Sequence, residues 1–288
     1  MSRRAWFRAA LAIAVLWAAG SAGAEELPVL AGAAMGTTYR VVLAGEHPDL
    51  ARGELHREIE AVLGRIDHAA SSWRDDSDIS RFNRAAAGAW VAVSEDLARI
   101  VTIARRVHAE TDGAFDITVG PLTRLWQAGG EPAAEQIAAA RRLVGLELVE
   151  LRPAGPNRPA ALRKRLDGVE LDLGGIGPGY GVDCIGERLA ALGSAGHLVV
   201  LGGEARAWGT RPDGRPWRVA VPGLAGGSRP LPPGQAIAFS TAGTGRGPID
   251  PRTGRPAAAA GPAAASAESC AVADARAVAA ALGAPVTD

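Results

Sequence analysis

A glycine-rich stretch at residues 174–181 is the part of the chain whose composition most directly suggests binding chemistry. It runs Gly-Gly-Ile-Gly-Pro-Gly-Tyr-Gly between an apolar run at 169–173 and a helical pattern that begins at Val182. Backbone N–H groups at such a junction can bind phosphate, because glycine permits close approach and the helix dipole favours negative charge. The spacing matches neither the dinucleotide fingerprint nor the Walker loop. The stretch therefore favours a phosphate site and a tight structural turn equally.

Three aspartates could also carry chemistry. Asp112 and Asp116 flank the sequence Gly-Ala-Phe. Asp112 is typical of a turn, whereas Asp116 has no such local role and could contact a ligand, although composition favours the turn for the pair. Asp274 lies on a predicted helix, where a lone carboxylate is usually solvated. As a magnesium ligand it would need further oxygens, because Mg²⁺ binds about six of them.

Two other segments leave a structural and a functional interpretation open. Trp73 lies in the polar stretch 71–83 and could either stack on a flat ligand or close over the core. The stretch 247–256, Gly-Pro-Ile-Asp-Pro-Arg-Thr-Gly-Arg-Pro, contains turn signals. Arg252 and Arg255 could meet phosphate there, but solvated side chains are the default expectation.

Hydrophobic periodicity predicts the elements that must position these residues. Alternation and short apolar runs predict strands at residues 37–43, 146–151, 169–173, 198–201, 217–221 and 236–239. Helical spacing predicts helices from Leu55 to Ile66, from a Ser94 cap to Val107, at 133–144, from Val182 to Leu192, and around Asp274. The Ala-rich stretch 257–265 has no periodic signal. The pattern indicates a mixed α+β chain without repeats.

Composition narrows the class of protein. The chain has 288 residues, enough for one large domain or two small ones. Its 31 basic and 31 acidic residues balance, which argues against nucleic acid as a partner. Cys184 and Cys270 could pair, but two buried apolar residues are the favoured interpretation.

The N-terminus has the pattern of a secretion signal at residues 1–24. Arg3, Arg4 and Arg8 precede an apolar run at 9–19, and Ser-Ala-Gly-Ala at 21–24 is a small-residue cleavage site. The run is shorter than the roughly 20 residues that a spanning helix needs, so an uncleaved anchor is the less favoured alternative. We expect export to the periplasm and a mature domain at 25–288.

The order of these motifs along the chain resembles that of the ApbE family, the FAD:protein FMN transferases. The resemblance covers nearly all of the mature chain. The matching stretches are Ala34-Met-Gly-Thr37, Ser72-Trp73 with Ser80-Arg-Phe-Asn83, Asp112-Gly-Ala-Phe-Asp116 with Gly120-Pro121, Leu171-Asp-Leu-Gly-Gly-Ile-Gly177 with Gly179-Tyr180 and Asp183, Leu201-Gly-Gly203, Ile249-Asp-Pro-Arg-Thr-Gly-Arg-Pro256, and Asp274-Ala275.

The resemblance implies an α+β fold of two parts with FAD in the cleft between them. It also implies a set of residues that contact FAD and a set that binds Mg²⁺. The implied FAD contacts are Met35, Trp73, Ala114, Phe115, Asp116, Asp172, Pro178 and Ile249. The implied metal positions are the backbone carbonyl of Gly175, the carboxylate of Asp274, and Val278, which has no side-chain oxygen.

The reaction that the resemblance implies is phosphoryl transfer. A Thr or Ser hydroxyl of an acceptor redox protein attacks the FMN phosphorus of FAD, and AMP leaves. Such a reaction depends mainly on neutralising charge, which Mg²⁺ can do. If water attacks instead, the same site is an FAD pyrophosphatase.

The chain departs from the family pattern at catalytic positions rather than at fold positions. Pro178 replaces the usual Lys, Gly247 replaces a His that could act as a base, and Val278 replaces Thr. Ala271 replaces an occasional acidic residue, and Glu204 replaces Asp. We also expect the family's closing strand after the last helix to be missing. No general base is identified. An active transferase is the favoured hypothesis, and a weakly active FAD-binding protein is the alternative.

Overall fold

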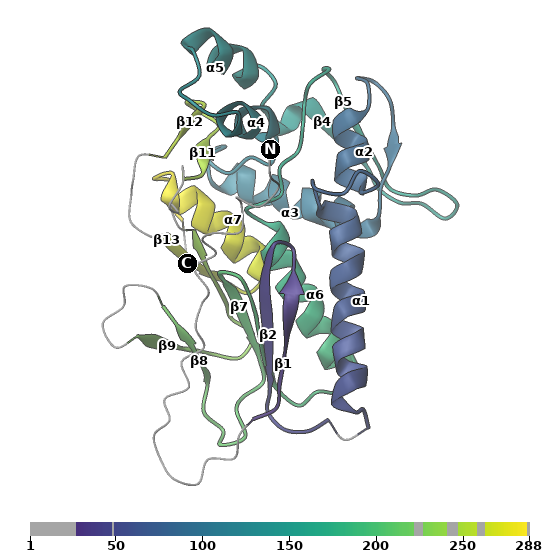
Figure 1. Ribbon diagram of the computed structural model, residues 1–288, viewed down its shortest axis with the longest axis vertical. Coiled ribbons are helices and arrows are strands. Elements are labelled where there is room, and N and C mark those ends of the chain that lie inside the picture. The colour runs from purple at the N-terminus through teal and green to yellow at the C-terminus, as the bar shows by residue number, and fades with distance from the viewer. Residues whose placement is uncertain (1–26, 48, 222–226, 241–246, 258–262, 287–288) are drawn as a thin grey trace.

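The computed structural model describes residues 27–47, 49–221, 227–240, 247–257 and 263–286. Its centre is a six-stranded sheet with helices packed on one face and a small two-stranded sheet on the other (Figure 1). A second part, built around a three-stranded sheet and short helices, lies above it (Figure 1). This arrangement confirms the expected α+β fold of two parts.

The central sheet is antiparallel at every pairing of its strands. Its order, with bounds, is β1 (Val29–Ala34), β2 (Thr37–Leu43), β6 (His197–Leu201), β7 (Glu204–Trp208), β10 (Ala236–Ser240) and β13 (Ala263–Ala267). The predicted strands at 37–43, 198–201 and 236–239 are confirmed. The Ala-rich strand β13 had no sequence signal. Its backbone is nevertheless bonded to β10, and α7 (Cys270–Ala281) packs against it.

Alternation along the strands divides the core between the two faces of the sheet. Tyr39 and Val41 of β2 belong to the larger cluster under the helices. Val42 faces the other way, toward Trp217 and Leu231. The last two residues come from the small sheet of β8 (Trp217–Ala220) and β9 (Ser228–Leu231). The prediction of a strand at 217–221 is therefore confirmed to within one residue.

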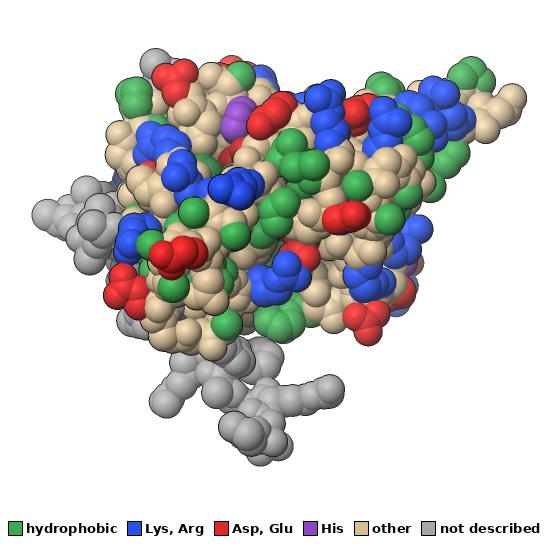
Figure 2. Space-filling view, turned by 90° about the horizontal axis from the view of Figure 1, so that it is seen from above, with side chains coloured by type: hydrophobic (Ala, Val, Ile, Leu, Met, Phe, Trp, Pro, Cys, Tyr) green, Lys and Arg blue, Asp and Glu red, His purple; other side chains and the backbone are tan. Residues whose placement is uncertain are grey.

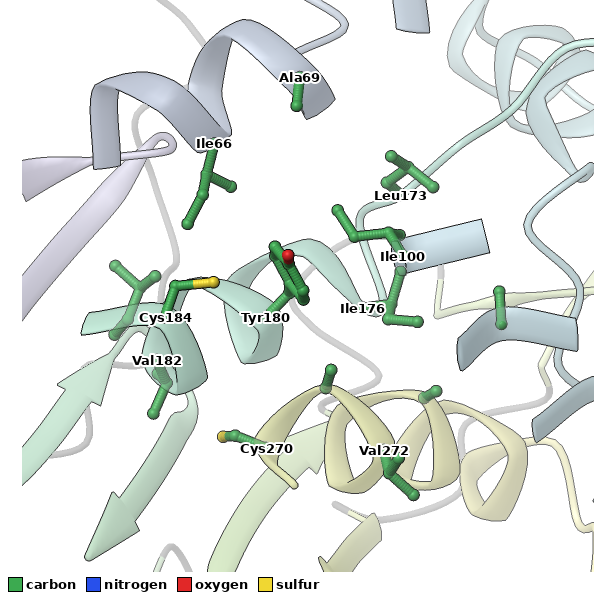
Figure 3. Close-up of a cluster of buried hydrophobic side chains, with 14 of the residues drawn as sticks. Ile66, Ala69, Ile100, Leu173, Ile176, Tyr180, Val182, Cys184, Cys270 and Val272 are labelled. Carbon is green, nitrogen blue, oxygen red and sulfur yellow. The ribbon is translucent and has the colours of Figure 1, made fainter. Parts of the chain in front are cut away.

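Seven helices occur in the described part of the chain. They are α1 (Arg52–Ala70), α2 (Asp78–Arg84), α3 (Glu95–Glu110), α4 (Gly120–Gln127), α5 (Ala134–Arg141), α6 (Gly177–Ala191) and α7. The predicted helices are all present, and the Ser94 side chain caps α3 by accepting a hydrogen bond from Leu97 N at 3.3 Å. Figure 3 shows Ile66 of α1 and Ile100 of α3 on one side of α6, and Val272 of α7 on the other. The helices thus form one continuous core.

Helix α6 begins inside the glycine-rich stretch, so the prediction of a loop to residue 181 is wrong for its second half. Pro178 occupies the first turn of the helix, where a missing N–H is tolerated. A Cβ on Gly179 would lie 2.4 Å from the carbonyl oxygen of Cys270, and one on Gly186 would lie 2.1 Å from the Trp208 ring. These glycines therefore allow α6 to pack closely on α7 and on the sheet.

The second part contains the three-stranded sheet β3–β5–β4. Its strands are β3 (Val91–Ala92), β5 (Ala161–Lys164) and β4 (Val149–Arg152). The predicted strand at 146–151 is wrong in its first half, because Leu146–Leu148 form a 3₁₀ turn before β4 begins. A separate hairpin joins β11 (Ile249–Asp250) to β12 (Arg255–Pro256).

The predicted strand at 169–173 does not form, and side chains take the place of a neighbouring strand. The amide of Asn83 donates to Leu171 O at 3.0 Å and accepts from Leu171 N at 2.8 Å. The buried Lys164 ammonium donates to Val169 O at 2.9 Å, and the N–H of Asp172 donates to Ile117 O at 2.7 Å. The segment is extended but has only one bridge, between Glu170 and Val119. These bonds pair backbone groups that a strand would bond to its neighbours.

Two expectations concern export and the cysteines. The predicted secretion signal at 1–24 lies outside the described residues. Within the described ranges, no helix has both the length and the apolar character to cross a bilayer. Cys184 and Cys270 are free and buried, as the favoured interpretation predicted.

Candidate functional site: a cleft of two joined cavities

A cavity of about 660 Å³ lies where α4, the start of α6, the β11–β12 hairpin and α7 converge. We call it the inner cavity. Most of the predicted FAD-contacting residues line it. Two of the three predicted metal positions also line it. These are Ala114, Phe115, Asp116, Asp172 and Ile249 for FAD, and Gly175 and Val278 for the metal.

A second cavity of about 710 Å³, the outer cavity, contains the remaining predicted FAD contacts. Met35, Trp73 and Pro178 line it, and Asp172 lines both cavities. Thr123, Gln127 and Gly174 are also shared by the two linings, and the cavities are therefore adjoining lobes of one cleft. Each lobe has the volume typical of a small-molecule site. The predicted site residues that line the cleft come from six separate segments of the sequence.

Met35 reaches the cleft at the tip of the β1–β2 hairpin. Met35 and Gly36 both have positive φ, at 52° and 75°, as the two central residues of a tight hairpin turn require. The Met35 side chain packs toward α6, where its Cε would lie 3.5 Å from a Cβ on Gly177. Met35 therefore lies in van der Waals range of the first turn of α6.

Trp73 does not close over the core, so that alternative is wrong. Its side chain is 88% exposed, and it lines the outer cavity from the loop after α1. A large aromatic surface left in solvent at the mouth of a cavity is available to stack on a ligand.

Asp116 has a local structural role, in line with the turn that composition favoured. Its Oδ1 accepts hydrogen bonds from Thr118 N at 2.7 Å and from Thr118 Oγ1 at 2.6 Å. Its Oδ2 lies 3.4 Å from Nδ1 of His108. Burial raises the pKa of the Asp116 carboxyl, although the bonds from Thr118 and the nearby His108 act against this. Asp116 therefore shapes the turn that presents Ala114 and Phe115 to the inner cavity.

Asp172 similarly shapes the backbone on the opposite wall. Its Oδ1 accepts from Gly174 N at 2.9 Å. The bonds from Asn83 to Leu171 hold the residue just before it. Asp172 is thus fixed at the boundary between the two lobes.

Two residues of α4 that the sequence analysis did not single out line both lobes. Thr123 and Gln127 are four residues apart, so they share one face of the helix. The Gly120-Pro121 pair is the sequence feature that could have indicated the start of this helix, because proline is favoured in the first turn of a helix. Without the tertiary structure, nothing indicated which face of α4 meets the cleft.

Both arginines of the 247–256 stretch form ion pairs with carboxylates. Arg252 pairs with Asp250, Nε to Oδ1 at 2.9 Å, and also donates to Leu282 O at 2.8 Å. Arg255 pairs with Glu131, Nη1 to Oε1 at 3.1 Å. Basic and acidic side chains are also interspersed on the face seen from the α4–α5 end (Figure 2). The hairpin is held by local ion pairs, and Ile249 projects to the inner cavity.

Asp274 lies behind the wall of the inner cavity, one helical turn before Val278 on α7. Its Oδ2 accepts from Gly179 N at 3.1 Å, the only hydrogen bond that the described residues give this carboxylate. Val278 in turn contacts Gly175, where a Cβ would lie 2.7 Å from its Cγ2. Asp274 thus contacts the first turn of α6 through Gly179, and Val278, one turn further along α7, contacts Gly175 just before α6.

Glu204 lies near Asp274 and was not included in the predicted metal site. Both carboxylates are buried, and neither forms a salt bridge within the described residues. Burial raises the pKa of Asp274 to about 7. Burial and the Asp274 charge together raise the pKa of Glu204 well above its usual value. Such a pair is stable only with a bound proton or a nearby cation.

The donors present fit Mg²⁺ in part. Asp274 has one oxygen without a hydrogen bond to the described residues, Glu204 supplies a second carboxylate, and the Gly175 carbonyl borders the inner cavity. Mg²⁺ commonly takes one or two carboxylates and completes its shell with substrate phosphates and water. Val278 offers no oxygen. The described ranges contain no group of three or more His, Cys, Asp or Glu side chains suited to a metal.

The chain matches known proteins over this whole region. Residues 35–285 match the ApbE family. A FAD:protein FMN transferase from Haemophilus influenzae is 36% identical over 200 residues, which are 67% of this chain and 57% of that relative. The alignment thus spans little more than half of the relative's length.

Two solved structures have the same fold. The flavinyl transferase ApbE of Pseudomonas stutzeri, in its apo form, superposes with a TM-score of 0.80 at 32% identity, covering 88% of this chain and 83% of the other. A histidine-to-glycine variant of the flavin transferase ApbE from Vibrio cholerae gives 0.78 at 33% identity, covering 90% and 87%.

Proposed function

Because the chain belongs to the ApbE family, we propose that it transfers FMN from FAD to a Thr or Ser hydroxyl of an acceptor redox protein. One observation carries the proposal. All eight residues expected to contact FAD line the two joined lobes of a single cleft. They come from segments between residue 35 and residue 249, and chance would not gather them.

The shape of the cleft suits a dinucleotide. FAD consists of two ring systems joined by a pyrophosphate, and the cleft consists of two lobes joined at Asp172 and Gly174. The exposed Trp73 offers a flat apolar face for the isoalloxazine ring, and this supports a flavin position in the outer lobe. The pyrophosphate then passes the start of α6, where glycine permits close approach of the backbone.

Mg²⁺ is the cation that we propose for this site. Asp274, with Glu204 nearby, and the carbonyl of Gly175 would hold it. When bound, it supplies charge neutralisation to the phosphates of FAD. Val278 would offer it no oxygen.

The proposed reaction replaces a phosphoanhydride bond of FAD with a phosphoester bond to the acceptor. The acceptor hydroxyl oxygen forms a bond to the FMN phosphorus, the bond from that phosphorus to the bridging oxygen breaks, and AMP leaves with that oxygen while the hydroxyl proton is released. The chain's own residues orient the two halves of FAD and keep water from the phosphorus. The family's basic positions are filled here by Pro178 and Gly247, so no side chain at either place can accept the proton.

We also propose that the protein works in the periplasm. The support is the predicted secretion signal at residues 1–24. Cell fractionation tests it, since recovery of the full-length, unprocessed chain in the cytosolic fraction would contradict export.

The test of the activity is AMP release. Purified protein is incubated with FAD and Mg²⁺, with and without a domain carrying an Asp-x-x-Ser/Thr-Gly-Ala-Ser/Thr acceptor motif. We expect AMP together with a covalently flavinylated acceptor. AMP without a labelled acceptor would indicate a pyrophosphatase, and bound FAD without AMP would refute the transferase.

The metal assignment is tested by Asp274→Ala, which we expect to abolish Mg²⁺-dependent AMP release. Asp213→Ala is the matched control, because Asp213 lies in an exposed turn where it accepts from Arg215 N. Unchanged AMP release from the Asp274 variant would reject Asp274 as a ligand.

A further inference from the structure

We infer that Asp183 is a positioning residue that holds the N-terminus of α7 against α6 and so determines where the Asp274 carboxylate lies. The inference rests on the proposed function, because it assigns Asp183 a part in building the proposed metal site. Asp183 belongs to α6 and is 91 residues before Asp274 in the sequence.

The Asp183 carboxylate makes four contacts, three of them with the start of α7. Its Oδ1 accepts from Cys270 N at 2.9 Å, and its Oδ2 accepts from Ala271 N at 3.0 Å. The Ser269 hydroxyl donates to Oδ2 at 2.8 Å. Nη1 of Arg206 lies 2.6 Å from Oδ1 and balances the charge.

These bonds replace a cap that α7 does not make for itself. Ser269 is the residue that precedes the helix, yet its side chain does not cap α7 and bonds Asp183 instead. The first N–H groups of a helix have no partner within the helix, and a negative charge there is favourable. Asp183 therefore supplies from α6 the cap that most helices carry on their own N-cap residue.

The second contact between the two helices runs in the opposite direction. Asp274 of α7 accepts from Gly179 N of α6. Gly179 precedes Asp183 by four residues, and Cys270 precedes Asp274 by four, so each pair is separated by one helical turn of about 5.4 Å. Each helix thus provides a carboxylate that accepts from a backbone N–H of the other helix, and we call this pair of contacts a clamp. Such a clamp fixes both the separation and the rotation of α7 relative to α6, and rotation decides where the Asp274 carboxylate points.

Asp183 does not contact substrate in this arrangement. It lines a separate cavity of about 580 Å³ with Arg206, Ser269 and Tyr180. Among the described residues, that cavity shares no lining residue with the inner or outer cavity. Asp183 therefore acts on the reaction through the elements that it holds together rather than by touching substrate.

The test compares Asp183→Asn, Ser269→Ala and the control Ser94→Ala. An asparagine keeps the size but turns an N–H₂ toward one of the donors, which leaves an N–H of α7 unpaired. Ser269→Ala removes one bond and keeps the other three. Ser94→Ala removes the cap of α3, a bond of similar kind that involves neither Asp183 nor Asp274. Each protein is measured for Mg²⁺ binding by calorimetry, for AMP release against Mg²⁺ concentration, for the KM of FAD at saturating Mg²⁺, and for thermal midpoint.

We expect Asp183→Asn to weaken Mg²⁺ binding and to raise the half-saturating Mg²⁺ concentration about tenfold or more, as residues behind metal ligands typically do. The KM for FAD should stay within about twofold, because no residue lining the cleft changes. Ser269→Ala should shift Mg²⁺ binding less and in the same direction, and it carries the test if the Asn variant does not fold. Ser94→Ala should lower the thermal midpoint without changing Mg²⁺ binding.

A lower thermal midpoint with unchanged Mg²⁺ binding in both Asp183→Asn and Ser269→Ala would overturn the inference, as would a wild-type protein that binds no Mg²⁺. Wild-type protein that binds Mg²⁺ without releasing AMP would refute the proposed function instead. In that case the calorimetric comparison would still decide the role of Asp183.

Discussion

The two sides of the cleft are built differently. On the α6–α7 side, Asp274 is 6% exposed and lies in a helix contact so close that Gly179 has no room for a side chain. On the opposite side, Trp73 is 88% exposed and extends from a loop, and Met35 lies at a hairpin tip. The α6–α7 side is part of the hydrophobic core, whereas the opposite side consists of a loop and a hairpin tip at the surface.

This difference separates stability from activity. On the α6–α7 side the same hydrogen bonds hold the helices and place the proposed metal ligand, so a substitution should change folding and reaction together. On the loop side a substitution removes a contact with ligand and leaves the core intact. The following predictions test that distinction, beginning with the largest expected effect.

Gly179→Ala should lower both the stability of the protein and its activity. The new methyl group would lie 2.4 Å from Cys270 O, so α7 must move and carry Asp274 with it. Overpacking of this kind costs about 1–3 kcal/mol of stability, and we expect AMP release to fall by roughly 100-fold. Denaturant unfolding and the AMP assay measure the two effects.

Gly64→Ala is the matched control, because Gly64 lies in α1 with open space around its Cα. It should leave activity unchanged and stabilise the protein slightly, since alanine favours a helix. Normal activity in the Gly179 variant would show that the α6–α7 contact tolerates displacement.

His197 should make the stability of the folded protein fall at acidic pH. It is buried in β6, where its Nε2 lies 3.0 Å from Gly186 O of α6, and burial lowers its pKa to about 4. Between pH 6.5 and pH 4 the unfolded chain binds a proton that the folded one excludes, so stability falls as pH falls. The loss amounts to about 3 kcal/mol at most.

Denaturant unfolding at pH 7 and pH 4 measures this loss, with His197→Gln as the comparison. The variant should lose about 3 kcal/mol less than the wild type over the same interval. Equal losses in the two proteins would mean that other groups cause the acid sensitivity.

Trp73→Ala should affect ligand binding alone. Loss of ring stacking costs about 0.5–1.5 kcal/mol, so the KM for FAD should rise by up to roughly tenfold. The free energy of unfolding should change by less than about 0.5 kcal/mol, because the side chain is exposed. Trp73→Tyr should retain most of the affinity, and an unchanged KM in the Ala variant would place Trp73 outside the flavin site.

Val278→Thr should produce the smallest effect, a gain. The two side chains have nearly the same shape, and threonine adds the oxygen that the family position usually has. We expect AMP release at low Mg²⁺ to rise roughly threefold. Val278→Ala is the control, since it changes packing without adding an oxygen; an equal gain in both variants would exclude coordination as the cause.

The sequence by itself predicted the elements whose signals are local. Apolar residues at helical spacing predicted α1 and α3 with their buried faces, and alternation predicted β2 over its whole length. The order of short motifs identified the family and the residues that line the cleft. These patterns survive in the sequence because each depends on neighbours a few positions away.

Only the tertiary structure decided the features that depend on distant partners. The segment 169–173 has the composition of a strand, but Asn83, which lies 88 residues before Leu171, satisfies its backbone instead. Gly179, part of the stretch that suggested a phosphate loop, provides room for α7. Asp183 caps a helix that begins 87 residues after it. Hydrogen bonds and close contacts of this kind exist only once the helices have packed, so no periodicity in the sequence records them.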